Sequence, residues 1–314
     1  MNFQQIRYVY EVVRRGLNVS EAAEALFTSQ PGVSKQIRLL EQELGVDIFV
    51  RHGKRLVGIT EPGKQILVIA GRMLRDMGNL RLVGEEFSHE REGRLSLATT
   101  HTQARYVLPP VVRAFVERYP AVRLSLHQGS PRQVCDMVLD GEADLAIAAD
   151  TATESEDLVL LPCFQWNRCI IVPYGHPLLE VKNLSLEVVS RYPLVTYDDA
   201  FSGRSLINKA FLGRGLKPNI VLTAIDSDVI KTYVAMGLGV GIVARMAYDA
   251  KHDADLAMMD AAHLFESATT RIALHRNAYL RGYVYSFIEY CAPHLTRQTV
   301  DQAMKGRQQE SYEL

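Results

Sequence analysis

Hydrophobic residues near the start of the chain recur at helical spacing in three successive stretches. The first runs from Phe3 to Val13 and the second from Val19 to Leu26, with Ser20 near its start as a candidate cap. Pro31 opens the third stretch, at a first-turn position where its missing N–H would be unpaired anyway. The apolar positions of this third stretch are Val33, Ile37, Leu40 and Leu44. The pattern predicts three short helices, the last two joined by a tight turn.

The third helix has a polar outer face, and no acidic residue lies between Glu24 and Glu41. Lys and Arg on such a face can contact phosphates, while Gln, Ser and Arg can pair with base edges in the major groove. The pattern therefore predicts a helix-turn-helix with a recognition helix, and the alternative is an ordinary helical hairpin with a solvated face. The candidate DNA-contacting residues here are Ser20, Thr28, Ser29, Gln30, Pro31, Ser34, Lys35, Gln36 and Arg38.

Two short strands are predicted next, at residues 47–51 and 55–60, around a turn at His52-Gly53-Lys54. This hairpin forms a wing whose tip carries Arg51, Lys54 and Arg55, with no neighbouring acid expected. A basic tip beside a recognition helix can reach the DNA backbone or the minor groove. In isolation, a solvated hairpin tip would be the better interpretation.

A long helix is predicted from Glu61-Pro62 to about residue 89. Four of its apolar residues recur every seven positions, as in a coiled-coil seam, namely Ile66, Met73, Leu80 and Phe87. The small domain before this helix offers the seam nothing to bury against. We therefore expect it to pair with the same helix of a second copy in a two-fold dimer, so that two recognition helices read two half-sites. Arg91-Glu92-Gly93 is the expected hinge after it.

From Arg94 onward the pattern changes to alternating strands and helices in two sets. The first set includes one helix from Thr102 to Tyr119, and a late strand is expected from Thr270 to Leu274. Two α/β halves with crossing connections form a cleft that can bind a small molecule at the carboxyl ends of the strands.

The fold class is therefore α/β, in three parts. Residues 1–60 form a winged helix-turn-helix DNA-binding domain and residues 61–90 a linker and dimerisation helix. Residues 91–314 form an effector-binding domain, with lobe I at about 91–164 and 270–295 and lobe II at about 165–269.

Composition changes this picture little. The formal net charge is −1, so a DNA-binding surface must be local. The four cysteines form no C-x-x-C pair and are expected to be reduced core thiols of a cytoplasmic protein, with a redox pair of Cys163 and Cys169 as the less favoured alternative. No signal peptide is expected at the N-terminus, and no apolar run is long enough to span a membrane.

Two other classes of protein are set aside. An enzyme is not expected, because no H-E-x-x-H motif or Cys–His metal spacing occurs, and no metal or cofactor site is predicted. Gly237-Leu-Gly-Val-Gly241 follows a helix and precedes a strand, which is the wrong order for a Rossmann turn. A stand-alone solute-binding protein would need a signal peptide and would not need residues 1–90.

Several blocks near the N-terminus form a distinctive pattern, namely Gln5-Ile-Arg-Tyr8, Thr28-Ser-Gln-Pro-Gly-Val-Ser-Lys35, Leu44-Gly45 and Thr60-Glu-Pro-Gly63. On these blocks, the whole chain resembles LysR-type transcriptional regulators. Longer blocks are similar to the CysB and Cbl branch, which controls sulfur assimilation, namely Ala98-Thr-Thr-His-Thr-Gln-Ala-Arg-Tyr106, His127-Gln-Gly-Ser-Pro131, Trp166-Asn-Arg168, Tyr192-Pro-Leu-Val-Thr-Tyr197 and Asp228-Val-Ile-Lys-Thr-Tyr233.

The resemblance implies a transcription activator that assembles through the long helix into dimers and then a homotetramer on promoter DNA, with RNA polymerase as a further partner. It also implies an effector domain of the periplasmic-binding-protein type, whose ligand between the lobes changes how the tetramer bends DNA. In this branch the ligand class is acetylserine, sulfate or a related sulfur metabolite. A LysR-type regulator of another pathway, with a retuned cleft, is the alternative.

The expected effector site begins at residues 99–103, between a strand end and a helix start, where backbone N–H groups and polar side chains can hold an anion. Without the resemblance, simple capping by Thr100 or Thr102 would be the better interpretation. With the family motif matched, the candidate site residues are Thr100, His101, Thr102, Gln103, Ser130, Ala149, Trp166 and Ser202. Ala149 departs from the Thr usual in sulfate-binding members of the branch, which puts sulfate itself in doubt.

Overall fold

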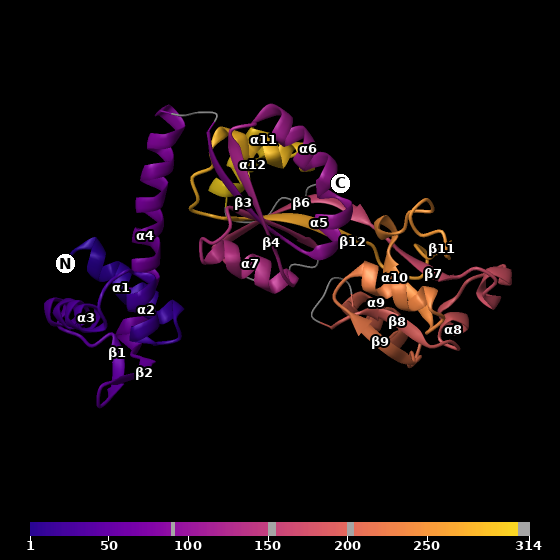
Figure 1. Cartoon of the computed structure of the whole chain (residues 1–314), viewed down its shortest axis with the longest axis horizontal. Helices are drawn as coiled ribbons and strands as arrows, with labels where there is room; N and C mark the ends of the chain where they lie inside the picture. Colours follow the sequence, from indigo (N-terminus) through magenta and orange to yellow (C-terminus); the bar gives the residue numbers. More distant parts are fainter. Residues whose placement is uncertain (89–91, 150–154, 200–203, 307–314) are drawn as a thin grey trace. The chain divides into compact units, whose positions relative to one another are not determined.

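The computed structural model describes residues 1–88, 92–149, 155–199 and 204–306. The chain divides into two compact units, Met1–Gly84 and Glu85–Leu314, and the boundary falls within one long helix (Figure 1). Arg91 of the expected hinge and the candidate site residue Ser202 lie outside the described residues. Among the described residues, none of the helices combines the length and the hydropathy needed to span a bilayer.

The N-terminal unit is a helical bundle with a β-hairpin. Its elements are α1 (Phe3–Arg14), α2 (Val19–Ala25), α3 (Gln30–Leu44), β1 (Phe49–His52), β2 (Arg55–Ile59) and α4 (Glu61–Ser88). Strands β1 and β2 pair antiparallel. Val9 of α1, Ala22 of α2 and Val33 of α3 are fully buried in one core, as the helical spacing predicted.

Short polar residues define the helix ends. Asn18, and not Ser20, caps α2, because its side chain accepts hydrogen bonds from the backbone N–H groups of Ser20 and Glu21. The expectation of a Ser20 cap is therefore wrong. Ser29 caps α3 by accepting from the N–H of Gly32, and Pro31 lies in the first turn. Gly45 ends α3 in the left-handed region, at a φ of 71°, which glycine adopts without strain.

Glu41 ties the wing to α3. Its buried carboxylate accepts hydrogen bonds from the backbone N–H groups of Ile48 and Phe49, at 2.9 and 3.3 Å. The same carboxylate pairs with both terminal nitrogens of Arg51, at 3.2 and 2.5 Å, and Asp47 lies 3.7 Å from that guanidinium. The expectation that Arg51 has no acidic neighbour is thus wrong, because the hairpin folds it back onto α3.

The first sheet of the C-terminal unit has the strand order β4-β3-β5-β12-β6. Its strands are β3 (Gly93–Thr99), β4 (Val122–Gln128), β5 (Leu145–Ala149), β6 (Leu158–Trp166) and β12 (Ala268–His275). Strand β3 is parallel to β4 and β5, whereas β12 is antiparallel to both of its neighbours. We call this sheet and the helices on it lobe I.

Helices cover both faces of the lobe I sheet (Figure 1). Those concerned are α5 (His101–Tyr106), α6 (Leu108–Arg118), α7 (Pro131–Leu139), α11 (Gly282–Cys291) and α12 (Arg297–Lys305). Phe115 of α6 and Phe287 of α11 pack with Leu97 in one cluster, and Val134 of α7 packs with Ala146 in another.

The predicted helix from Thr102 to Tyr119 is two helices, α5 and α6, which meet at Val107. The reason is the proline pair at 109–110. Proline lacks the N–H that a continuing helix needs, so both prolines are accommodated in the first turn of a new helix.

Lobe II is built on the second sheet, in the order β11-β7-β10-β8-β9. Its elements are β7 (Arg168–Pro173), α8 (Leu186–Val189), β8 (Leu194–Tyr197), α9 (Arg204–Leu212), β9 (Ile220–Ala224), α10 (Ser227–Ala235), β10 (Val240–Ala244) and β11 (Leu256–Asp260), with short 3-10 turns at Pro177–Glu180 and Arg245–Ala247. The chain enters lobe II between β6 and β7 and returns to lobe I between β11 and β12. Lobe I is therefore discontinuous in sequence.

All four cysteines are free thiols. Burial raises the pKa of both Cys163 and Cys169 to about 12, which keeps them protonated and unreactive at neutral pH. The redox alternative receives no support from this environment.

The C-terminal end of α4 is fixed to α11. The buried Arg281 pairs with Glu85 at 3.3 Å and with Glu86 at 3.0 Å, and Glu86 also accepts from the N–H of Gly282 at 3.0 Å. Buried ion pairs with supporting hydrogen bonds hold one geometry.

Glu41→Ala is predicted to lower the free energy of unfolding of the N-terminal domain by about 3 kcal/mol, because it leaves two backbone N–H groups and Arg51 without their acceptor. The measurement is urea unfolding of the full chain. Glu43→Ala is the control, since Glu43 is exposed and pairs only with the N-terminal amine among the described contacts. Equal stability of the two variants would contradict the structural role given to Glu41.

Candidate nucleic-acid interface and effector site

The outer face of α3 presents polar side chains on a rigid helix. Val33, Ile37 and Leu40 are almost completely buried, so the rotation of the helix about its axis is fixed. The opposite face leaves Gln30, Lys35 and Arg38 exposed and Ser34 and Gln36 half-buried. Gln30 Nε2 donates to Ser34 Oγ at 3.3 Å, which links the two candidate base-reading residues nearest the helix start.

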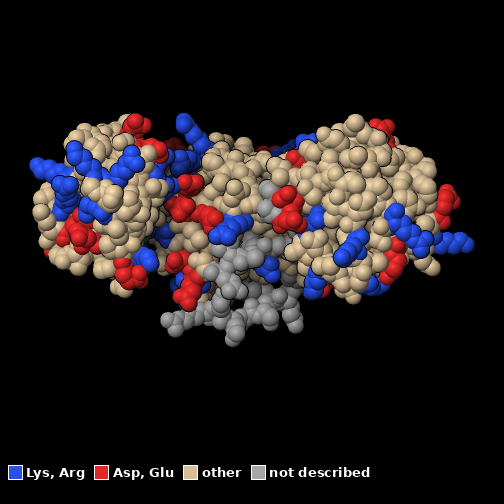
Figure 2. Space-filling view, turned by 90° about the horizontal axis from the view of Figure 1, so that it is seen from below, with Lys and Arg blue, Asp and Glu red and all other residues tan. Residues whose placement is uncertain are grey.

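The other candidate DNA contacts lie around this helix. Thr28, Ser29 and Pro31 are exposed at the turn before α3 and in its first turn, and Ser20 is exposed on α2. In the wing, Lys54 and Arg55 are exposed, whereas Arg51 is 25% exposed and held by Glu41. Figure 2 shows Lys and Arg side chains gathered over the N-terminal domain, at the left of the view.

The candidate effector residues gather at the first turn of α5. Thr100 occupies the N-cap position, but its side chain makes no capping hydrogen bond. Three polar atoms are shielded from solvent and have no partner among the described residues, namely Thr100 Oγ1, His101 Nδ1 and Gln103 Oε1. The capping alternative for Thr100 is therefore not supported.

Thr270 of β12 is a residue that the sequence analysis missed. Its fully buried hydroxyl oxygen accepts hydrogen bonds from Gln103 Nε2 and from Trp166 Nε1, both at 3.1 Å. The sequence placed Thr270 in a late strand, but no local signal shows that this strand pairs between β5 and β6 beneath α5. In that ladder Thr270 lies directly opposite Ala149.

The remaining lobe I candidates have different surroundings. Ser130 caps α7 in a reciprocal capping box with Gln133. Ala149 and Trp166 are buried in one cluster with Ala244 and Ala247 of lobe II. This cluster joins the lobes beside Thr270.

Lobe II contributes Tyr197, at the end of β8. Its buried hydroxyl lies 2.7 Å from Ser227 Oγ, accepts from the N–H of Ala244 at 3.1 Å, and hydrogen-bonds Thr102 of α5. Burial raises the pKa of Tyr197, so the hydroxyl stays protonated and can donate. Thr102 thus joins the expected site to lobe II.

A second link between the lobes centres on Asp228 of α10. Tyr106 Oη donates to Asp228 at 2.6 Å, Lys231 lies 3.1 Å from the same carboxylate, and Arg105 lies 3.5 Å away. Burial alone would raise the pKa of Asp228, but the hydrogen bonds from Tyr106 and Lys231 outweigh it and hold that pKa below its usual range.

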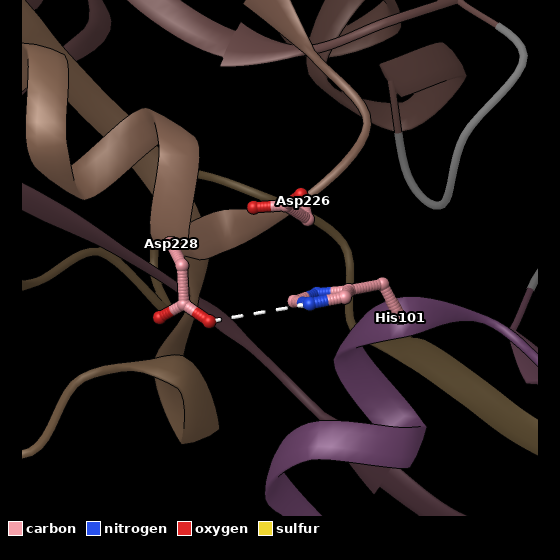
Figure 3. A group of neighbouring side chains, drawn as sticks. All are labelled: His101, Asp226 and Asp228. Atoms are coloured by element: carbon pink, nitrogen blue, oxygen red, sulfur yellow. Dashed lines mark ion pairs between the residues drawn. The ribbon is translucent and has the colours of Figure 1, made fainter.

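His101 points from α5 toward Asp228, with Asp226 nearby (Figure 3). These three side chains could be mistaken for metal ligands. Asp226 caps α10 by accepting from the N–H of Val229, and His101 Nε2 lies 4.0 Å from Asp228. Because Lys231 and Arg105 already compensate the charge of Asp228, a cation here would meet two positive groups, and we assign no metal to it.

Comparison with known families identifies the class of protein. Residues 3–64 match the bacterial regulatory helix-turn-helix family of lysR type, and residues 88–296 match the LysR substrate binding domain. The chain belongs to the LysR family of transcriptional regulators. The expected fold class, a helix-turn-helix domain followed by a two-lobed α/β effector domain, is confirmed.

Individual relatives narrow the branch. The chain is 53% identical over 300 residues to the HTH-type transcriptional regulator SsuR of Burkholderia cenocepacia, covering 96% of this chain and 97% of the relative. It is 53% identical over 314 residues to CysB of the same organism, covering all of both chains. The crystal structure of the cofactor-binding domain of the Cbl transcriptional regulator matches with a TM-score of 0.66 and 43% identity, over 68% of this chain and 95% of that one. The resemblance to the CysB and Cbl branch is thus confirmed.

Asp228→Asn is predicted to lower the melting temperature of the full chain at neutral pH, and this difference from wild type is predicted to shrink as the pH is lowered below the usual carboxyl range. Since the pKa of Asp228 is lower in the folded state, its ionisation stabilises that state above the usual carboxyl range, and the contribution is lost as pH falls through the lowered pKa. Asp255→Asn, at an exposed position in lobe II, is the control. A melting difference that persists unchanged in acid would argue against the ion-pair explanation.

Proposed function

We propose that this protein activates transcription of sulfur-assimilation genes in response to a small acid of sulfur metabolism. The observation that carries the proposal is the set of solvent-shielded, unpartnered polar atoms on Thr100, His101 and Gln103. Buried polar groups are almost always hydrogen-bonded, so several unpartnered ones on one helical turn support a ligand that pairs with them. The similarity to CysB, SsuR and Cbl supports the ligand class, namely acetylserine, sulfate or a related sulfur metabolite.

In this proposal α3 enters the major groove of promoter DNA. Lys35 and Arg38 contact phosphates, while Gln30, Ser34 and Gln36 read or position base edges. In this arrangement the N-terminal end of α2 and the turn before α3 approach the DNA backbone. The candidate contacts there are Ser20, Thr28, Ser29 and Pro31. Lys54 and Arg55 of the wing reach the DNA backbone or the minor groove. Arg51, whose charge is balanced by Glu41, supports the DNA contact of the wing mainly by orienting it.

The proposed assembly is a dimer formed through α4 and a tetramer built from two dimers. The supporting observation is that α4 leaves large apolar side chains uncovered, with Leu80 73% and Phe87 87% exposed. Such side chains on one helix are typical of an interface between copies. We place the protein in the cytoplasm, with RNA polymerase as a further partner, and propose no catalytic reaction for it.

A second candidate function is control of another pathway through a retuned effector site. Ala149 favours it, because this fully buried position opposite Thr270 carries no hydroxyl. A ligand that needs fewer hydrogen-bond donors from the protein than sulfate would suit alanine better, as would a ligand with a methyl group next to residue 149.

Lys35→Ala is predicted to weaken binding of a promoter fragment uniformly across sequences and to reduce the slope of log affinity against log salt by about 0.9, because one phosphate contact is lost. Fluorescence anisotropy at several salt concentrations measures the slope. Lys217→Ala, an exposed change in the effector domain, should leave it unaltered. An unchanged slope in the Lys35 variant would remove this residue from the interface.

Thr100→Val is predicted to weaken effector binding about tenfold or more while leaving effector-free DNA binding intact, because one buried hydrogen bond to a charged ligand is lost. Calorimetric titration of the full chain would use O-acetylserine, N-acetylserine, sulfate, thiosulfate and adenosine phosphosulfate. Thr223→Val, at an exposed position on β9, is the matched control. Equal ligand affinity in the two variants would place the effector elsewhere.

A further inference from the structure

Tyr106, the last residue of α5, reaches from lobe I to lobe II. Its hydroxyl donates to Asp228 Oδ1 at 2.6 Å, and its ring packs against the buried cluster that joins the lobes. Burial and the hydrogen bond to Asp228 raise the pKa of Tyr106 to about 12, so the phenol keeps its proton and remains a donor at neutral pH. A hydrogen bond to an ionised acceptor is stronger than one between neutral groups. This bond therefore favours the arrangement of the lobes in which it forms.

The acceptor is built entirely within lobe II. Lys231 Nζ lies 3.1 Å from Asp228 and 3.0 Å from Asp253. The same ammonium donates to the carbonyl oxygen of Ala247 at 3.0 Å. Asp228 therefore keeps its position and its charge partner when Tyr106 leaves. The bond can open without stranding an uncompensated charge, which makes it suitable as a reversible contact.

The phenol is the strongest of the contacts that α5 makes to this carboxylate. Arg105 lies 3.5 Å from Asp228, but its side chain is 64% exposed, and water screens such ion pairs. His101 Nε2 lies 4.0 Å away, which is beyond hydrogen-bonding distance (Figure 3). The link between α5 and Asp228 thus depends mainly on Tyr106.

The same arrangement covers the first turn of α5. Thr100 Oγ1 and Gln103 Oε1 are shielded from solvent, and Thr102 hydrogen-bonds the buried Tyr197 of lobe II. A ligand can pair with the shielded atoms only after α5 and lobe II have separated enough to admit it. The contacts that oppose this separation therefore also oppose ligand binding.

We propose that the hydrogen bond from Tyr106 to Asp228 is an autoinhibitory latch, which holds the lobes in the arrangement that covers the effector site and opens when an effector binds. The inference rests on the proposed function and adds the regulation of the same site. A latch of this kind lowers the apparent affinity of the ligand by the fraction of molecules in which the site is accessible. By linkage, the bound effector weakens the latch by the same factor.

The first test is Tyr106→Phe, which removes the hydroxyl and keeps the ring. The variant is expected to bind N-acetyl-L-serine about tenfold more tightly than wild type in calorimetric titration of the full-length protein, because the accessible arrangement is more populated. Tyr285→Phe is the matched control. Tyr285 is also a half-buried phenol that donates to a carboxylate, but its partner Asp301 lies in lobe I as well, so the affinity should not change.

A second readout needs no ligand. Hydrogen–deuterium exchange of the full-length protein should be faster for the amides of α5 in Tyr106→Phe than in wild type, and unchanged there in Tyr285→Phe. The amides of β3, in the centre of lobe I, are the internal reference. Faster exchange of β3 to the same extent would show general destabilisation and would overturn the latch.

The two proposals fail in different ways. Equal or weaker binding of N-acetyl-L-serine by Tyr106→Phe would overturn the latch and leave the proposed function standing. If neither wild type nor Tyr106→Phe bound N-acetyl-L-serine, sulfate or thiosulfate while promoter DNA was still bound, the proposed effector class would fail instead. The exchange measurement would then decide on the latch alone, and unchanged exchange of α5 in Tyr106→Phe would overturn it.

Discussion

The effector domain depends on one strand, β12, which returns from lobe II and inserts between β5 and β6. It is hydrogen-bonded along both edges, so the discontinuous halves of lobe I become a single sheet. This insertion also positions the buried polar residues of the candidate effector site, because it brings Thr270 against α5 and beside the end of β6. Pairing strands that are so far apart in the sequence costs chain entropy, and the hydrogen bonds and burial of the completed sheet offset this cost.

The sequence was most informative where the cause of the structure is local. Helical spacing predicted the buried faces of the N-terminal helices, and Pro31 marked the start of α3. Local cues were misleading at one helix end, because Ser20 was expected to cap α2, whereas Asn18, two residues earlier in extended backbone, provides the cap. The break at Val107 was only partly foreseeable, since a proline pair can bend one helix or begin another.

Features formed by distant residues could not be predicted. Periodicity assigned Glu41 to α3 and Arg51 to the wing, but their ion pair depends on how the hairpin folds back over the helix. The same holds for Thr270, which hydrogen-bonds Gln103, 167 positions away in the sequence, and Trp166, 104 positions away. The family resemblance indicated Thr100 and Gln103 because both lie in one contiguous motif. It gave no indication of Thr270, which is a single threonine in an ordinary strand.

Helix α5 carries both the proposed ligand-binding residues and residues that contact lobe II. Gln103 and Tyr106 are three residues apart, so the amide held by Thr270 and the phenol bound to Asp228 lie on the same side of the helix. A ligand can shift the lobes only by the difference in its affinity for their two arrangements. The unpartnered atoms of α5 are shielded from solvent, and Ala149 and Trp166 are packed against lobe II. Under the proposed function, a ligand that reaches the unpartnered atoms of α5 would compete with the contacts that this helix makes to lobe II. That competition would give the ligand different affinities for the two lobe arrangements, as a small-molecule switch requires.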